Sequence, residues 1–181
     1  MDNNYWKNAY QNTWDQSSER EKFMVDWIRE NTGLEAEVIG LGAGTSDFID
    51  GSATQNGHEK GDADLHIVDT NIYIEVTGPL TKSVPVHSPL WFRPDKFENA
   101  IRNRVNRHDT FFAHHCPSED LWRIIHVDDN LVQRYQRGAF RVVTPRIRGR
   151  QETYVEIPSN DKSIQSLGYL KNYLIDETDS N

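Results

Sequence analysis

The chain has 181 residues and a formal net charge of −8, with 36% hydrophobic and 27% charged residues. These values are typical of a single globular domain over residues 1–181 and exclude a disordered chain. The sequence has no apolar run of membrane-spanning length, no signal-peptide pattern at the N-terminus and one cysteine, Cys116, so we expect no membrane segment, no internal disulfide and a reducing, cytoplasmic location.

The hydrophobic pattern predicts helices and strands that alternate along the chain. The helix that starts at Ser18 follows from a capping box, with Glu21 three residues further on. Pro94 suits the first position of a later helix, with Phe97, Ile101 and Val105 on its buried side. The expected elements are an arm or short helix over 1–17, a helix over 18–31, a strand over 35–41 ending in a glycine-rich turn at 40–44, a hairpin of strands 65–68 and 72–76, an irregular segment over 78–93, a helix over 94–108, strands from 111 and over 121–127, a helix over 130–137, strands over 140–143 and 153–157, a helix over 164–175 and a frayed tail over 176–181.

This order of elements predicts the fold class. A hairpin followed by a helix and a further strand is typical of a helical crossover between neighbouring strands of one sheet. We therefore expect an α/β domain in which a mixed β-sheet is flanked by helices.

The predicted hairpin carries acidic residues in positions that call for a cation. Glu75 lies in the middle of an otherwise apolar strand, where a carboxylate is costly to bury without a positive partner. Asp62 and Asp64 precede the first strand. Carboxylates that converge on one edge of a sheet are ligands for a hard cation, so we expect Mg²⁺ or Mn²⁺ at Asp64 and Glu75, with the Val76 carbonyl and Asp62 as further ligands. The alternative is that the exposed acids are only solvated.

On these residues the sequence resembles the PD-(D/E)XK superfamily, the restriction-endonuclease-like nucleases. The family has a helix with a glutamate, a strand pair with an aspartate and a (Glu/Asp)-X-Lys triplet, a crossover helix and another strand. Here Glu19 or Glu21, Asp64 and the triplet Glu75-Val76-Thr77 take these places. The resemblance covers residues 18–127, which it makes the nuclease-like core, with 1–17 as an arm and 128–181 as a C-terminal elaboration.

The triplet departs from the family at its third position, where Thr77 replaces lysine. The resemblance implies that this lysine helps to form and hold the attacking hydroxide, and a threonine hydroxyl has no charge to do so. Three lysines are candidates to replace it: Lys96 in the crossover helix, Lys82 in the loop before that helix, and Lys60. Lys96 is preferred because one turn into the helix it can point back toward the end of the sheet.

The basic residues are unevenly distributed. Residues 1–80 have a net charge of −10 and residues 93–150 a net charge of +5, and the stretch 130–151 has six arginines and no acid. Arginine suits bidentate contacts to phosphate, which position a nucleic acid without reading its sequence. The alternative is that the arginines pair with acids of the same fold. The candidate nucleic-acid-binding residues are Arg93, Arg102, Arg104, Arg107, Arg134, Arg137, Arg146, Arg148 and Arg150.

Together these observations predict a metal-dependent endonuclease that hydrolyses DNA phosphodiester bonds, with assembly into a homodimer left open. In this prediction Asp64 and Glu75 bind the metal, Glu21 is an accessory acid, and Lys96 or Lys82 supplies the missing charge. Two alternatives remain. One is a catalytically inactive module of the same fold that binds nucleic acid or a protein. The other is a metal-assisted hydrolase of small phosphoesters.

Overall fold

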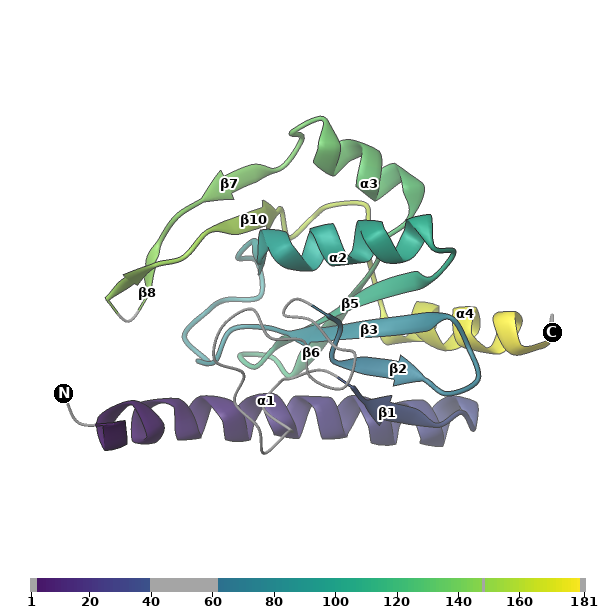
Figure 1. The fold of residues 1–181 in the computed structure, drawn as a ribbon, viewed down its shortest axis with the longest axis horizontal. Helices are drawn as coiled ribbons and strands as arrows, with labels where there is room; N and C mark the ends of the chain where they lie inside the picture. The colour runs from purple at the N-terminus through teal and green to yellow at the C-terminus, as the bar shows by residue number, and fades with distance from the viewer. Residues whose placement is uncertain (1–2, 40–61, 148, 180–181) are drawn as a thin grey trace.

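The computed structural model describes residues 3–39, 62–147 and 149–179, with backbone only for residues 3–14, Arg150 and Asp179 (Figure 1). The expected glycine-rich turn at 40–44, Lys60 and Arg148 lie outside these residues. None of the described helices is both long and apolar enough to cross a membrane. The elements in chain order are α1 (Asn3–Thr32), β1 (Ala36–Val38), β2 (Leu65–Ile67), β3 (Ile72–Thr77), β4 (Leu90–Phe92), α2 (Pro94–Val105), β5 (Asp109–Cys116), β6 (Leu121–His126), α3 (Asp129–Gln136), β7 (Arg141–Val143), β8 (Arg146–Ile147), β9 (Arg150–Gln151), β10 (Tyr154–Ile157), β11 (Ile164–Gln165) and α4 (Leu167–Asp179).

A six-stranded mixed sheet forms the centre of the fold, in the order β1-β2-β3-β5-β6-β11. The predicted hairpin is present as the antiparallel pair β2–β3, with Asp69 in its turn at φ 61°. Strands β3 and β5 are parallel, and α2 is the crossover between them. The prediction of a mixed sheet flanked by helices is therefore confirmed.

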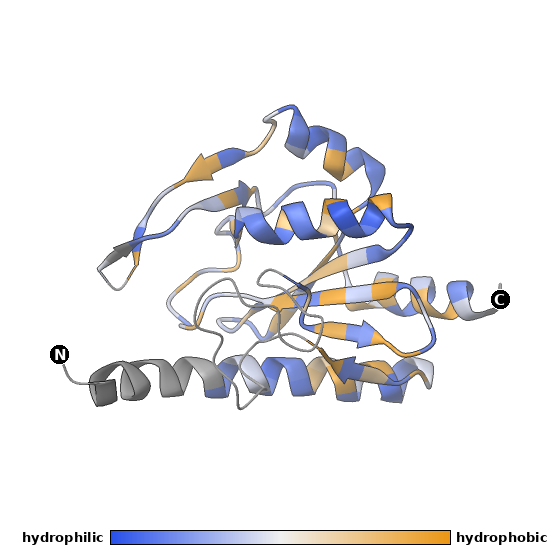
Figure 2. Cartoon of the chain, viewed as in Figure 1, coloured by the Kyte–Doolittle hydropathy of each residue, from blue (hydrophilic) through white to orange (hydrophobic). Residues whose placement is uncertain are grey.

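Each face of this sheet is covered by its own core. On one face, Met24 and Ile28 of α1 and Leu170 and Leu174 of α4 pack against strand residues such as Ile74. On the other face, α2, α3 and a second sheet of order β4-β10-β7 enclose a cluster that includes Phe97 and Phe112. Figure 2 shows that hydrophobic residues are concentrated on the central strands, whereas the outer turns of the helices are hydrophilic. Because side chains alternate along β3, Ile74 faces α1 and Glu75 faces α2.

The sheet of β4, β10 and β7 extends into a hairpin arm, β8–β9, on the same side of the molecule as the start of α1 (Figure 1). The sequence analysis missed β4, because it interpreted residues 78–93 as irregular. Phe92 pairs with Val155, 63 positions later, and such a distant partner leaves no local signal.

Both terminal helices differ from the prediction. The prediction that a helix begins at the Ser18 capping box is wrong, because α1 begins at Asn3 and continues through residue 18 without a break. The C-terminal helix starts at Leu167 rather than at 164, because Ile164 pairs with Ile125 as strand β11. It then continues to Asp179 through the segment that was expected to fray. In α2, Phe97 is buried as predicted. Val105, which was also predicted to be buried, is 79% exposed, whereas the polar Asn99 is buried.

Candidate active site

Asp64 lies directly before β2 and is fixed to β3 by two hydrogen bonds. Its backbone N–H donates to the Ile74 carbonyl at 3.1 Å, which continues the antiparallel ladder by one residue. Its carboxylate Oδ2 accepts the backbone N–H of Val76 at 2.8 Å. Asp64 is 8% exposed and Glu75 is 6% exposed. The hairpin therefore holds the two predicted metal ligands together at the end of one strand pair.

Lys96 completes this group from the crossover helix. Its Nζ lies 2.7 Å from Glu75 Oε2 and 3.0 Å from the backbone carbonyl of Asp62. Pro94 and Asp95 precede it in the first turn of α2, so the ammonium group reaches back to the sheet, as the sequence analysis expected of this residue. Among the described side chains, Lys96 is the lysine that forms an ion pair with Glu75.

The two carboxyl groups affect each other's ionisation. Burial, and next the charge of Asp64, raise the pKa of Glu75 to about 8, although Lys96 acts in the opposite direction. Burial also raises the pKa of Asp64 against the Lys96 ammonium and the Val76 N–H. For Lys96, burial alone would lower the pKa, but the charges of Glu75 and Asp64 more than offset it, so its pKa is raised. When both carboxyl groups are ionised, the site carries more negative charge than one ammonium group neutralises.

Asp62 is held by α2 rather than by the hairpin. Its Oδ1 accepts the side-chain amide of Asn99 at 2.7 Å and lies 3.4 Å from Arg102 Nη2. Asn99 is a site residue that the sequence analysis missed. The available signal was the spacing of Lys96, Asn99 and Asn103 at i, i+3 and i+7, a polar stripe on the side of α2 that faces the sheet.

The donor set fits a hard divalent cation. Two adjacent carboxylates whose pKa values are raised are the groups that a metal ion would stabilise in their charged form. Asp64 and Glu75 would hold it, with the Val76 carbonyl as a third oxygen. No group of three or more histidine, cysteine, aspartate or glutamate side chains arranged for a metal is found among the described residues. A cation here would therefore keep several water ligands, as Mg²⁺ does in proteins.

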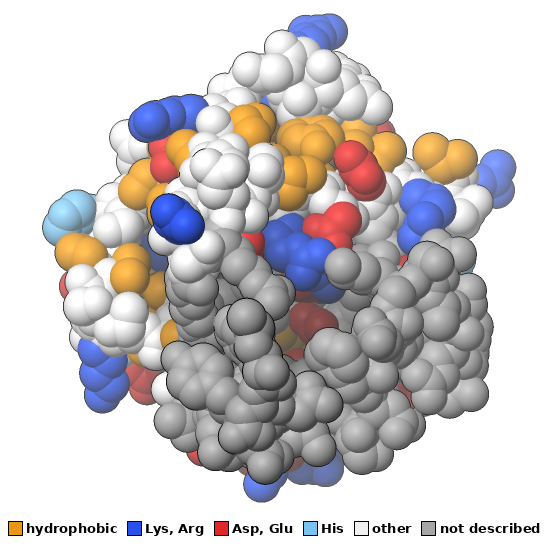
Figure 3. Space-filling view, turned by 60° about the vertical axis from the view of Figure 1, so that its left-hand side comes forward, with side chains coloured by type: hydrophobic (Ala, Val, Ile, Leu, Met, Phe, Trp, Pro, Cys, Tyr) orange, Lys and Arg blue, Asp and Glu red, His pale blue; other side chains and the backbone are white. Residues whose placement is uncertain are grey.

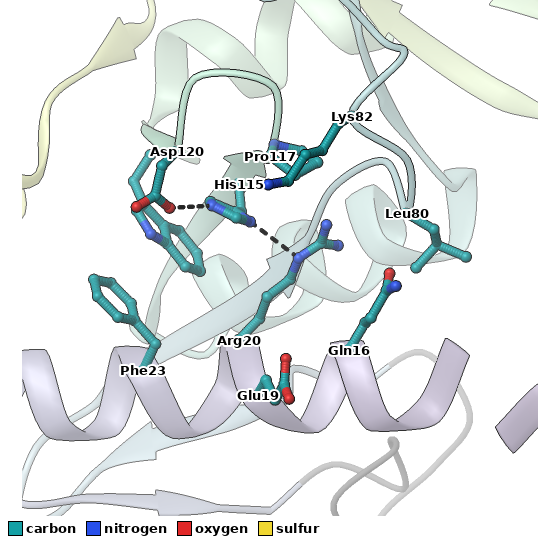
Figure 4. A pocket seen from close by; sticks show the side chains of 10 residues that line it. Gln16, Glu19, Arg20, Phe23, Leu80, Lys82, His115, Pro117 and Asp120 are labelled. Carbon is teal, nitrogen blue, oxygen red and sulfur yellow. Dashed lines mark hydrogen bonds and ion pairs between the residues drawn. The ribbon is translucent and has the colours of Figure 1, made fainter. Parts of the chain in front are cut away.

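The remaining catalytic candidates lie on β3, on α1 and in the loop that follows β3. Thr77 is the last residue of β3, is half-buried and pairs with His114 of β5. Glu21 is buried on α1, 4% exposed. Glu19 and Lys82 line a separate pocket of about 330 Å³ between α1 and the ends of β5 and β6 (Figure 4).

Arg20 also lines this pocket, and the sequence analysis did not predict it as a site residue. It is 8% exposed and donates to the backbone carbonyls of Gly78, at 2.9 Å, and Pro79. Its Nε lies 3.2 Å from His115 Nδ1, and His115 Nε2 lies 2.9 Å from Asp120 (Figure 4). Burial lowers the pKa of Arg20. Arg20 thus connects α1 to the residues that follow β3. The sequence could not predict this contact, because the partners of Arg20 here are backbone carbonyls, which every residue has.

The nine candidate arginines divide into three groups. Four of them contact acids of the same chain, which supports pairing within the fold for these residues: Arg93 with Asp95, Arg102 with Asp62, Arg104 with Asp109 and Asp129, and Arg134 with Asp161. Arg107, Arg137 and Arg146 are exposed. Arg148 and the side chain of Arg150 lie outside the described part of the chain. Figure 3 shows basic and acidic side chains next to one another near the middle of the face in view.

No protein-family model and no curated protein matches this sequence. Similar folds exist among solved structures. One is the structure of D212, a nuclease from a fusselovirus, with a TM-score of 0.50 and 16% sequence identity over 89% of each chain. The fold is nuclease-like. At this identity the similarity concerns the fold, and the assignment of this nuclease-like fold to the PD-(D/E)XK superfamily remains a prediction.

Proposed function

We propose that this protein is a metal-dependent nuclease that hydrolyses phosphodiester bonds in DNA. The observation that supports it best is the Lys96 ammonium 2.7 Å from the Glu75 carboxylate, with Asp64 next to it, in a nuclease-like fold. In this proposal Lys96, from α2, takes the part of the lysine that Thr77 replaces in β3.

The proposed chemistry follows from the charges. Asp64 and Glu75 would hold a divalent cation, which would neutralise the phosphate and lower the pKa of a bound water. Glu75 must give up its proton for this, since its pKa is raised to about 8. The Lys96 ammonium lies within reach of Glu75 and stabilises negative charge that develops on the attacking oxygen and the phosphate. Glu21 stays an accessory candidate because of its burial on α1.

The experiment is a titration of Mg²⁺, Mn²⁺ and Ca²⁺ against linear, branched and single-stranded DNA, with cleavage followed on gels. Glu75→Gln and Asp64→Asn remove one charge each and should abolish cleavage. Glu37→Gln, on the exposed edge strand β1, is the matched control and should cleave as the unmodified protein does. Cleavage that survives Glu75→Gln would refute the proposal.

A second function is supported by the same ion pair. Lys96 contacts Glu75 without any metal, and four candidate arginines are paired within the fold. Both features suit a catalytically inactive module that binds nucleic acid or a protein. Saturable DNA binding with no cleavage in any of the three metals would select this function.

A further inference from the structure

The sheet of β4, β10 and β7 has one face in the protein core and one face outside it. Phe92 and Val155 pack into the core beneath α2, so alternation turns their neighbours outward. The register places Trp91, Glu156 and Arg141 in one row across the three strands. Val143 pairs with Tyr154 and also points outward. We call the polar and aromatic outward side chains of this sheet and of the residue that follows β4 the outer face: Trp91, Arg93, Arg141, Tyr154 and Glu156.

The outer face presents an oriented aromatic pair. The rings of Trp91 and Tyr154 are stacked, with centroids 5.5 Å apart and planes 25° apart. Trp91 is nevertheless 38% exposed. Its indole N–H donates to Glu156 Oε2 at 3.0 Å, which fixes the direction of the ring. An exposed aromatic side chain that is held in place can stack on a nucleobase at little entropic cost.

Arginines lie around this pair, two of them next to acids of the same chain: Arg93 contacts Asp95 and Arg141 lies near Glu156. Arg141 is 77% exposed at its side chain and lies 3.7 Å from Glu156, and Arg93 is 46% exposed. The hairpin arm adds the exposed Arg146, within the 130–151 stretch that has six arginines and no acid in a chain of net charge −8. A local excess of arginine in an acidic protein is complementary to a polyanion.

The outer face adjoins the helix that carries Lys96. Arg93 is the N-cap residue of α2 and contacts Asp95, and Lys96 follows one residue later. Asp95 is close enough to Glu75 for its charge to act on that carboxyl group. Trp91 and Arg93 therefore lie only five and three residues before Lys96 along the chain, at the N-terminal end of α2.

We propose that the outer face binds an unpaired stretch of a nucleic acid strand, with one base stacked on Trp91 and phosphates at Arg93 and Arg141. This inference rests on the proposed function and names its substrate class: DNA with unpaired bases beside the cleavage point. Bases in an intact duplex are stacked on one another and are not available to Trp91, so the surface discriminates against fully paired DNA.

The test measures binding without cleavage. Fluorescence anisotropy of a labelled single-stranded oligonucleotide, and of a blunt duplex of the same length, is recorded in EDTA at fixed ionic strength. Trp91→Leu should weaken single-strand binding about tenfold and change duplex binding less than twofold. The control is Phe23→Leu, which removes another exposed ring stacked on a tryptophan, on the α1 side of the sheet, and should leave both affinities unchanged. Thermal unfolding followed by circular dichroism checks that both variants fold.

Three results would overturn the inference. They are unchanged single-strand binding by Trp91→Leu, an equal loss for single strand and duplex, and an equal loss caused by Phe23→Leu. Unmodified protein that binds neither DNA would also overturn it and would leave a protein partner for this face. Cleavage is measured separately, so the two proposals can fail independently. A protein that cleaves DNA but binds single strands equally well after Trp91→Leu would refute the binding surface alone. A protein that does not cleave but binds single strands through Trp91 would refute the proposed hydrolysis alone.

Discussion

Replacing Lys96 by methionine removes one ammonium group and retains a side chain of similar length. The lost contacts are those to Glu75 Oε2, at 2.7 Å, and to the Asp62 carbonyl, at 3.0 Å. If Lys96 stabilises charge on the reacting groups, DNA cleavage in Mg²⁺ should fall by about 10²–10³-fold. Lys96→Arg keeps the charge and should retain part of the activity. Lys22→Met, at an exposed position of α1, is the control and should cleave normally.

The raised pKa of Glu75 limits the loss of stability that Lys96→Met should cause. In general, breaking a buried ion pair costs about 3–5 kcal/mol, because it leaves one charge uncompensated. Because burial raises the pKa of Glu75 to about 8, proton uptake by this carboxyl group offsets part of that cost when the ammonium group is removed. Lys96→Met should therefore lower the free energy of unfolding by only about 1–2 kcal/mol, the value of the lost hydrogen bonds. Urea unfolding at pH 7 measures it.

Metal affinity separates the two roles of Lys96. Removal of a positive charge beside two carboxylates should increase Mg²⁺ affinity about tenfold, measured by calorimetry with the metal alone. The expected variant thus binds metal more tightly and cleaves less. A Lys96→Met protein that cleaves within threefold of normal would show that the ammonium group has no part in hydrolysis. Weaker Mg²⁺ binding would show that Lys96 organises the carboxylates rather than competing for them.

Three further predictions follow from described contacts. First, the free energy of unfolding without metal should decrease between about pH 4.5 and pH 8, by at most about 1.4 kcal/mol per pH unit, because the unfolded chain loses the Glu75 proton near pH 4.5 and the folded chain retains it to about pH 8. Glu75→Gln should flatten this part of the profile, and an unchanged slope would locate the effect elsewhere. Second, Asp109→Asn should cost about 1–3 kcal/mol in thermal unfolding, because the Asp109 carboxylate contacts Arg104, His126 and Tyr173, and these contacts lower its pKa. A loss below about 0.5 kcal/mol would contradict it. Third, Gly78→Ala should cost about 2–5 kcal/mol, since φ is +145° and the new Cβ would lie 2.1 Å from the His115 carbonyl oxygen. Normal urea unfolding of this variant would show that the strand end adjusts freely.

Local patterns predicted the part of the fold that contains the site. The β2–β3 hairpin follows from alternating side chains and a polar turn, and α2 begins at Pro94 as expected. The orientation of Lys96 toward the sheet could also be predicted from the sequence, because a residue one turn into a helix has few directions in which to point. Its contact with Glu75 joins residues only 21 positions apart.

The elements that were missed depend on distant partners or on competition between signals. Strand β4 becomes a strand because β10 pairs with it. The Ser18 capping box matched a real motif, but the residues before it extend the same helix, so Ser18 lies inside α1. Arg20 looks like any surface arginine of a helix until Gly78 and Pro79 bring their carbonyls to it. Burial of Asn99 likewise depends on Asp62.

The position of Lys96 on α2 also has a consequence for how such proteins are detected. A search pattern that requires acid, any residue and lysine in three successive strand positions fails here, because Thr77 occupies the third position. The proposed site is encoded instead as an aspartate, a glutamate 11 residues later and a lysine 21 residues after that, in the first turn of a helix that begins with proline. If Lys96 provides the charge as proposed, the strand does not have to, and we expect relatives to vary at its third position while they keep the spacing from the glutamate to the lysine in the helix.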